Sequence, residues 1–376
     1  MNPDVAYGKQ TLADGIRSRF IDNGNGLSMH ILEAGFDRPD RPCVLLLHGF
    51  PELAYSWRHI LLPLADAGYH IIAPDQRGYG RTTGWDPDYD GDLASYRILN
   101  LVQDVVGLTR ALGYDRVTAV IGHDFGSLVA SWCALTRPDV FRSFVMMSSP
   151  FGGPPSPVSA GNISGVNIHE ELALLEPPRK HYQQYYTTRG ANTNMQKCPQ
   201  GIHDFLRAYY HFKSADWSQN DPHLLSSWTA AAISQLPRYY VMDLEPGMAE
   251  TVAPEMPSAQ HISDCSWLPD EELAVYSEEY RKNGFQGGLQ WYRGAALIGD
   301  DLRAFSGQTI DSPACYIAGK RDWGTYQKPG SFERMQTGTC TRMEGVHLIE
   351  RAGHWVQQEQ PLVTARLLTE FLNQRK

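Results

Sequence analysis

An apolar run, Val117-Thr118-Ala119-Val120-Ile121, leads directly into Gly122-His123-Asp124-Phe125-Gly126, and a helical pattern follows as far as Thr136. A buried strand, a sharp turn and a helix in this order expose the central residue of the turn, which can then act as a nucleophile. The two glycines fit such a turn, because a Cβ at either position would collide with the neighbouring strand and helix. We therefore predict that Asp124 is a catalytic nucleophile.

A carboxylate nucleophile implies a particular kind of substrate. It attacks an electrophilic sp3 carbon, displaces oxygen or halide, and leaves an ester on the enzyme. A base must then activate water to hydrolyse that ester, and we predict that this base is His354. Asp322, which follows the apolar run at residues 314–318, is predicted to orient the histidine. His48 and His123 are the alternative bases, but both lie in tight turns and are interpreted as structural.

Hydrolysis of an ester at Asp124 places negative charge on the ester carbonyl oxygen, which then needs hydrogen-bond donors. Backbone N–H groups suit this task because they are fixed in place. The predicted donors are the N–H of Phe125, which follows the nucleophile, and the N–H of Phe50 in the turn His48-Gly49-Phe50-Pro51.

Short apolar runs recur along the chain, at residues 44–47, 70–73, 117–121, 144–147, 314–318 and 348–349. Helical patterns lie between or after them, at residues 93–112, 126–136 and 361–373. This alternation predicts an α/β fold with a mostly parallel, buried sheet. A Gly/Asn turn between residues 18–21 and 27–32 predicts an antiparallel pair of strands at the N-terminal end.

The alternation stops after residue 147, where prolines and glycines cluster, and no comparable strand candidate follows until residue 314. The pieces between are helical in pattern, at residues 201–212, 224–235 and 270–282, and ten of the 19 tyrosines fall in this segment. We predict a core domain of residues 1–150 and 300–376 and a helical cap domain of residues 151–299.

Composition excludes several classes of protein. The 376 residues include 33 Lys and Arg against 42 Asp and Glu, a net charge of −9, which argues against a nucleic-acid partner. No apolar stretch approaches the roughly 18 to 20 residues of a membrane span. The six cysteines lack metal-site spacing, and the N-terminal residues lack a signal-peptide pattern. We expect a cytoplasmic enzyme that uses no metal and no cofactor.

These features resemble the α/β-hydrolase fold and, within it, the epoxide hydrolases. The resemblance covers nearly the whole chain and is carried by His48-Gly49-Phe50-Pro51, Asp75-Gln76-Arg77-Gly78-Tyr79-Gly80, the turn around Asp124, and Gly353-His354-Trp355. It implies helices on both faces of the sheet and an apolar epoxide that reacts with water to give a vicinal diol. The family usually has Trp after the nucleophile, whereas this chain has Phe125.

The resemblance also implies two cap tyrosines that hold the epoxide oxygen and protonate it as the ring opens. Residues 284–293 look like the family's stretch ending in Trp-Tyr-Arg, which points to Tyr292, and residues 181–186 resemble its early cap segment, which points to Tyr182. Tyr239 competes for the first role, but it lies in an apparent cap expansion at residues 216–262. The residues expected to contact substrate are Tyr182, Tyr292, Phe50, Phe125 and Trp355.

Two other functions stay open on the sequence alone. A haloalkane or haloacid dehalogenase would use the same aspartate, but it commonly needs side-chain N–H donors for the halide, and Phe50 and Phe125 offer none. A receptor that has lost turnover on the same fold is a remote alternative. The sequence leaves open the particular epoxide, the selectivity, the oligomeric state and the role of residues 216–262.

Overall fold

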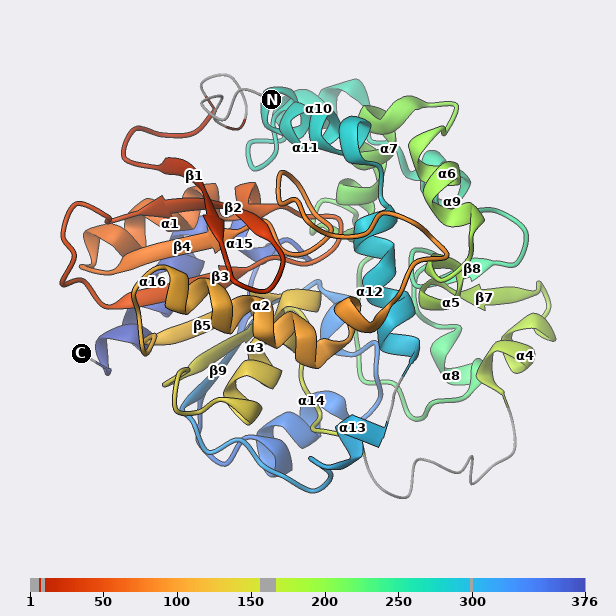
Figure 1. Cartoon of the computed structure of the whole chain (residues 1–376). Helices are drawn as coiled ribbons and strands as arrows, with labels where there is room; N and C mark the ends of the chain where they lie inside the picture. The colour runs from red at the N-terminus through yellow and green to blue at the C-terminus, as the bar shows by residue number, and fades with distance from the viewer. Residues whose placement is uncertain (1–6, 8–10, 156–166, 298–299, 376) are drawn as a thin grey trace.

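The computed structural model describes residues 7, 11–155, 167–297 and 300–375. Its main feature is an eight-stranded sheet with the strand order β1-β2-β4-β3-β5-β6-β9-β10 (Figure 1). The strands are β1 (Arg17–Asp22), β2 (Ser28–Ala34), β3 (Cys43–Leu47), β4 (His70–Pro74), β5 (Ala119–His123), β6 (Phe144–Met147), β9 (Ala314–Gly319) and β10 (Met343–Ile349). The pairs β1–β2 and β2–β4 are antiparallel and the others are parallel, which confirms the predicted fold class.

The five central strands, β3, β4, β5, β6 and β9, are buried along their whole length. This explains their continuous apolar sequences, because side chains on both faces of the sheet meet a covering layer. The edge strand β10 is mostly part-exposed and carries polar residues. β5 lies between β3 and β6, so Asp124, which follows it, emerges near the middle of the sheet.

Helices cover the sheet. α1 packs against α16, and α2 packs against α3. The helical segments of this part are η1 (Ala54–Trp57), α1 (Arg58–Asp66), η2 (Ala94–Tyr96), α2 (Ile98–Ala111), α3 (Phe125–Thr136), η5 (Trp323–Thr325), α14 (Ser331–Arg334), η6 (Met335–Thr339), α15 (Val356–Glu359) and α16 (Pro361–Asn373).

Among the described residues, the chain between β6 and β9 contributes no strand to this sheet, and its part at residues 168–296 gathers beside the sheet in Figure 1, coloured green to cyan. Its elements are α4 (Ile168–Ala173), β7 (Arg179–His181), α5 (Tyr182–Tyr186), α6 (Gly190–Gln196), α7 (Gly201–Lys213), α8 (Ala230–Ile233), β8 (Val241–Asp243), α9 (Met248–Val252), η4 (Ala253–Glu255), α10 (Ala259–Asp264), α11 (Asp270–Asn283), α12 (Gln286–Ala296) and α13 (Asp300–Arg303). The sequence did not predict the small antiparallel pair β7–β8.

One predicted helix is mostly wrong. Residues 224–235 were expected to be helical, but only α8, at Ala230–Ile233, forms there. The side chains of Ser227 and Thr229 hydrogen-bond to each other at 3.1 Å just before it. Short hydroxyl side chains favour such local bonds over continuation of a helix.

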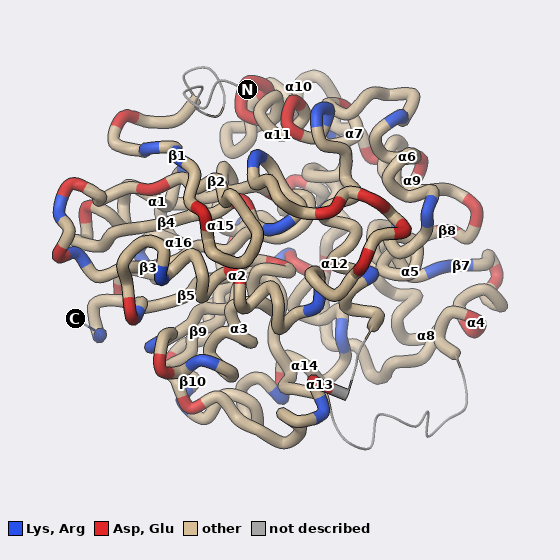
Figure 2. The backbone as a smooth tube through the Cα atoms, viewed as in Figure 1, with Lys and Arg blue, Asp and Glu red and all other residues tan. Residues whose placement is uncertain are grey.

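Charge is spread over the molecule. Figure 2 shows acidic and basic residues interspersed along the described chain, with acidic residues frequent in the loop at 86–92. Within the described ranges, no helix has both the length and the apolar composition that crossing a bilayer would require.

Candidate active site

Asp124 occupies the turn between β5 and α3. Its φ is +52°, a left-handed conformation that is uncommon for residues other than glycine and that often occurs at active sites. The neighbouring glycines are required by close backbone contacts. A Cβ at Gly122 would lie 2.0 Å from the carbonyl oxygen of Gly126, and one at Gly126 would lie 2.3 Å from that of Leu47. The predicted sharp turn is therefore present.

The carboxylate of Asp124 meets two of the predicted partners. Its Oδ1 accepts the backbone N–H of Phe50 at 3.1 Å, and its Oδ2 lies 3.3 Å from Nε2 of His354. Gly49 permits this approach, because a Cβ there would lie 2.4 Å from the Cβ of Asp124. No hydrogen bond from the Phe125 N–H to Asp124 is present among the described residues.

Asp124 is held in its ionised form. Burial alone would raise its pKa, but the hydrogen bond and charge of His354, and the charges of Lys213 and His123, together hold the pKa well below its usual value. The carboxylate is therefore available as a nucleophile throughout the neutral pH range.

His354 lies between two carboxylates. Its Nδ1 is 3.0 Å from Oδ1 of Asp322, which follows β9. The same Oδ1 accepts the N–H of Gly324 at 2.7 Å, so the acid is itself fixed. Burial opposes ionisation of Asp322, yet His354 lowers its pKa. This arrangement directs Nε2 toward Asp124, as a base that activates water against an ester there requires.

A buried polar network holds the loop that carries His354. Nδ1 of His123 lies 2.5 Å from Oε2 of Glu52, and Nε2 of His123 lies 2.6 Å from the carbonyl oxygen of His354. Gln357 and Gln358 donate to Oε1 of Glu52 at 2.8 and 3.1 Å. From the sequence, His123 was interpreted as structural and Glu52 was missed. The only sequence signal for Glu52 was its place just after the Gly49-Phe50-Pro51 turn.

The two predicted tyrosines come together above the turn. Tyr292, in α12, packs edge-on against Phe50 and Phe125, with ring centroids 5.7 and 5.2 Å away. Tyr182, at the start of α5, lies 6.1 Å from Tyr292 between ring centroids. Burial is the main cause that raises the pKa of both phenols well above its usual value, and the negative charge of Asp124 adds to this effect. Both phenols therefore remain protonated, and the hydroxyl of Tyr182 donates to Oε1 of Gln327 at 3.1 Å.

Tyr239, the alternative to Tyr182 as the first proton donor, makes its contacts with other residues. Its hydroxyl donates to Oδ1 of Asn220 at 2.7 Å, and its ring packs on Phe212 and Tyr240. Tyr186, which sequence reasoning missed, lies beside Tyr292, with ring centroids 4.9 Å apart. It follows Tyr182 by four residues, so helical spacing was the available signal.

Trp355 is completely buried behind His354. Its indole N–H donates to the carbonyl oxygen of Tyr210 at 2.8 Å, and its ring centroid lies 4.7 Å from that of His354. Its predicted contact with substrate stays a prediction. Among the described residues, no three His, Cys, Asp or Glu side chains are grouped in a way that could hold a metal ion.

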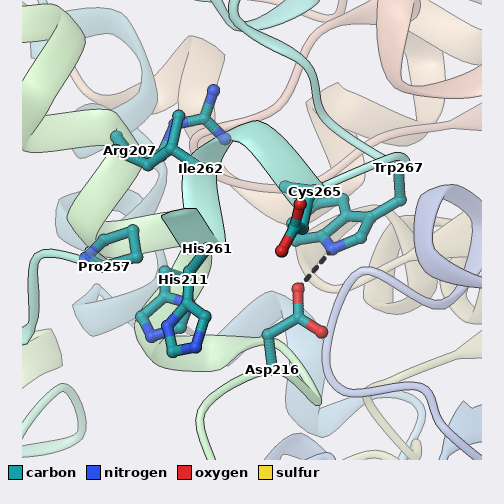
Figure 3. A pocket seen from close by; sticks show the side chains of 9 residues that line it. Arg207, His211, Asp216, Pro257, His261, Ile262, Cys265 and Trp267 are labelled. Atoms are coloured by element: carbon teal, nitrogen blue, oxygen red, sulfur yellow. Dashed lines mark hydrogen bonds between the residues drawn. The ribbon is translucent and has the colours of Figure 1, made fainter. Parts of the chain in front are cut away.

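A separate pocket lies in the segment between β6 and β9. It is lined by Arg207, His211, Asp216, Pro257, His261, Ile262, Asp264, Cys265 and Trp267 (Figure 3). The indole N–H of Trp267 donates to Asp216 at 2.8 Å across it. None of the predicted site residues lines this pocket, although some of its residues belong to the expansion at 216–262.

Comparison with known proteins gives a consistent result. A family model described as alpha/beta hydrolase fold matches residues 42–189. The chain is 33% identical to Epoxide hydrolase B of Mycobacterium tuberculosis, over 94% of this chain and 97% of that protein. It is 32% identical to Epoxide hydrolase 3 of Siraitia grosvenorii, over 93% and 96%.

Solved structures extend the similarity to three dimensions. An epoxide hydrolase from an endophytic Streptomyces superposes with a TM-score of 0.77 at 30% identity, over 96% of both chains. Potato (Solanum tuberosum) epoxide hydrolase I superposes with a TM-score of 0.73 at 29% identity, over 96% of this chain and 99% of that one.

Proposed function

The chain belongs to the epoxide hydrolases of the α/β-hydrolase fold, and on that premise we propose that it converts an epoxide and water to a vicinal diol through an ester at Asp124. One observation carries the proposal. The ionised carboxylate of Asp124 lies within 3.3 Å of both a backbone N–H and Nε2 of His354, and the protonated pair Tyr182 and Tyr292 stands over it.

In the first step, an oxygen of Asp124 attacks a ring carbon and the bond from that carbon to the epoxide oxygen breaks. The electron pair moves to that oxygen, which takes a proton from Tyr182 or Tyr292. The products are a neutral ester at Asp124, a free hydroxyl group and a tyrosinate. The hydrogen bond from Gln183 and the bond to Gln327, at 3.2 and 3.1 Å, orient the hydroxyl of Tyr182.

In the second step, water loses a proton to Nε2 of His354 and its oxygen bonds to the ester carbonyl carbon. The N–H groups of Phe50 and Phe125 hold the resulting oxyanion. The tetrahedral intermediate then collapses, the bond to the alkyl oxygen breaks, and that oxygen takes the proton from His354. The acid left at Asp124 gives up its proton, which restores the tyrosine.

The division of the chain is part of the proposal. Residues 1–150 and 300–376 form the core domain, with Asp124, Asp322 and His354, and residues 151–299 form the cap domain, with Tyr182 and Tyr292. The second boundary, at residue 299, lies outside the described residues. The aromatic rings around Asp124 fit a small apolar epoxide. The cytoplasmic location expected from the sequence is also proposed, and cell fractionation would test it.

The halide-releasing alternative lacks support in the geometry. A dehalogenase needs N–H donors that point to the departing halide. The indole near Phe125 belongs to Trp291, with ring centroids 5.2 Å apart, but its N–H already donates to the carbonyl oxygen of Arg77 at 2.8 Å.

The proposal is tested by intact-mass analysis of the wild type and His354→Gln after brief incubation with styrene oxide, with diol assayed in parallel. We expect diol from the wild type. In the variant we expect a substrate-sized mass gain on Asp124, because the ester forms but its hydrolysis lacks a base. The matched control is His223→Gln, at an exposed histidine. Normal turnover by the His354 variant would contradict the mechanism.

A further inference from the structure

Lys213, the last residue of α7, is a buried cation that the proposed mechanism does not use. It is 4% exposed. Its ammonium lies over four aromatic rings, at 5.5, 5.9, 5.1 and 5.2 Å from the centroids of Tyr209, Tyr239, Tyr240 and Trp355. No ion pair among the described residues includes it. Aromatic faces attract a cation, but they do not neutralise its charge.

The helix α7 presents two pairs of side chains in two directions, one pair toward the pocket of Figure 3 and the other toward the loop that carries His354. Arg207 and His211, four residues apart, line the pocket of Figure 3. Tyr209 and Lys213, also four residues apart, lie on the side of the catalytic loop, because four-residue spacing places side chains on one helix face. The carbonyl oxygen of Lys213 accepts the N–H of His354 at 2.9 Å, so the backbone ties this cation to the active site.

The charge of Lys213 acts on the catalytic carboxylates. Burial lowers the pKa of Lys213, and the attractions that oppose this are those of Asp124, Asp322 and Glu52, with Asp124 first. Conversely, Lys213 is among the groups that lower the pKa of Asp124. Asp322 has His354 as a direct partner, and Glu52 has His123, whereas Lys213 stands apart from all three carboxylates.

We propose that Lys213, through its charge, favours hydrolysis of the Asp124 ester at the expense of its formation. The inference rests on the proposed function. The carboxyl group of Asp124 carries a negative charge in the free enzyme, is neutral in the ester and is negative again in the tetrahedral intermediate. In the ester state the negative charge lies instead on a tyrosinate, and Lys213 is not among the groups that shift the pKa of Tyr182 or Tyr292. A fixed cation at Lys213 therefore stabilises the first and third states more than the second. It therefore slows ring opening, speeds ester hydrolysis and keeps the ester from accumulating.

This role predicts opposite changes in the two steps. A side chain that only supports the loop would, when replaced, misplace Asp124 and His354 together and slow both steps. Loss of a charge alone leaves ester formation unchanged or faster and makes ester hydrolysis slower. The backbone bond from His354 to Lys213 survives any substitution at this position, so side-chain variants isolate the charge.

The experiment follows a single turnover of styrene oxide by rapid quench and intact mass, which measures ester formation and decay separately. In Lys213→Met we expect the ester to form at least as fast as in the wild type and to decay about tenfold more slowly, as expected for loss of one nearby charge. Lys213→Gln should behave alike. Lys213→Arg, whose guanidinium keeps the charge between the rings, should decay within about threefold of the wild type.

The control is Lys282→Met, which removes a lysine that is 51% exposed and paired with Glu279. Thermal unfolding of every variant shows that the fold is retained. Equal slowing of both steps in Lys213→Met and Lys213→Gln, or no change in either step, would overturn the inference. If the wild type forms neither ester nor diol, it is the proposed function that fails.

Discussion

The two halves of the active site hold their groups in different ways. On the sheet side, backbone contacts fix Asp124 and His354. Asp124 lies in a left-handed turn and accepts the N–H of Phe50, while His354 donates its N–H to Lys213 and accepts a bond from His123 at its carbonyl oxygen. Opposite them, mainly ring packing and bonds between side chains place Tyr182 and Tyr292. Backbone contacts fix position within narrow limits, whereas packed side chains can shift to fit a substrate. In the proposed mechanism the first half supplies the nucleophile and the base, and we expect the second half, which supplies the proton, to adjust more readily to the substrate.

The largest loss of activity is expected from a substitution at Asp124, which backbone contacts hold in place. Asp124→Ala removes the attacking oxygen, and no neighbouring carboxylate can take its place because the turn holds only this one. We expect diol formation to fall by about 10⁴-fold or more, with no mass adduct on the enzyme. Chiral chromatography of the diol and intact mass measure both.

Asp115→Asn is the control, at an exposed aspartate just before β5. It should keep wild-type activity. Substantial turnover by Asp124→Ala would move the nucleophile elsewhere and remove the basis for contrasting the two halves.

Substitutions of Tyr182 and Tyr292, in the opposite half, should reduce activity less than Asp124→Ala does and should slow only ester formation. Tyr292→Phe and Tyr182→Phe keep the rings but remove a proton donor, and the second tyrosine remains. We expect each to slow ester formation by about 10- to 100-fold and to leave ester hydrolysis unchanged. Tyr239→Phe should stay within about twofold, because its hydroxyl bonds to Asn220 instead. Rapid-quench intact mass separates the two steps.

The tyrosine series also distinguishes the two candidates for the first donor. A larger loss in Tyr239→Phe than in Tyr182→Phe would transfer the role to Tyr239. If each tyrosine variant also slowed ester hydrolysis, these residues would be supporting the loop of His354, and the two halves would not be separable.

The same contrast explains what could be predicted from the sequence. The turn around Asp124 is encoded by consecutive residues, so the amino-acid sequence alone reveals its pattern. His354 and Asp322 follow strands and were predicted from their order in the chain. Glu52 and Lys213 gain their places from contacts with residues more than 70 and 140 positions away, to His123 and His354. No local pattern marks such contacts. Tyr182 could be suggested only through the resemblance, since its position depends on packing against α12.

Glu359 joins the two halves and gives the smallest predicted effect. Its Oε2 accepts the N–H groups of Gly353 and Ala215 at 2.9 and 2.8 Å, and its Oε1 accepts that of Trp355 at 2.9 Å. It thus ties the loop of His354 to the end of α7. Burial raises the pKa of Glu359 from 4.5 to about 8.

The sign of the resulting pH dependence follows from proton binding. Between about pH 4.5 and 8 the folded protein keeps the proton on Glu359, whereas the unfolded chain releases it. The stabilisation is complete below about pH 4.5, falls by about 1.4 kcal/mol per pH unit between the two pKa values, and is lost as the pH rises through 8. Glu359→Gln cannot titrate. The free energy of unfolding of the wild type, minus that of the variant, should therefore fall from pH 5.5 to 8.5 in urea denaturation. Glu370→Gln, at a carboxylate that is 57% exposed, should show no such slope. A difference that instead rises with pH would mean that the three N–H donors keep Glu359 ionised in the folded protein. A charged carboxylate, and not a neutral acid, would then connect the loop of His354 to the end of α7.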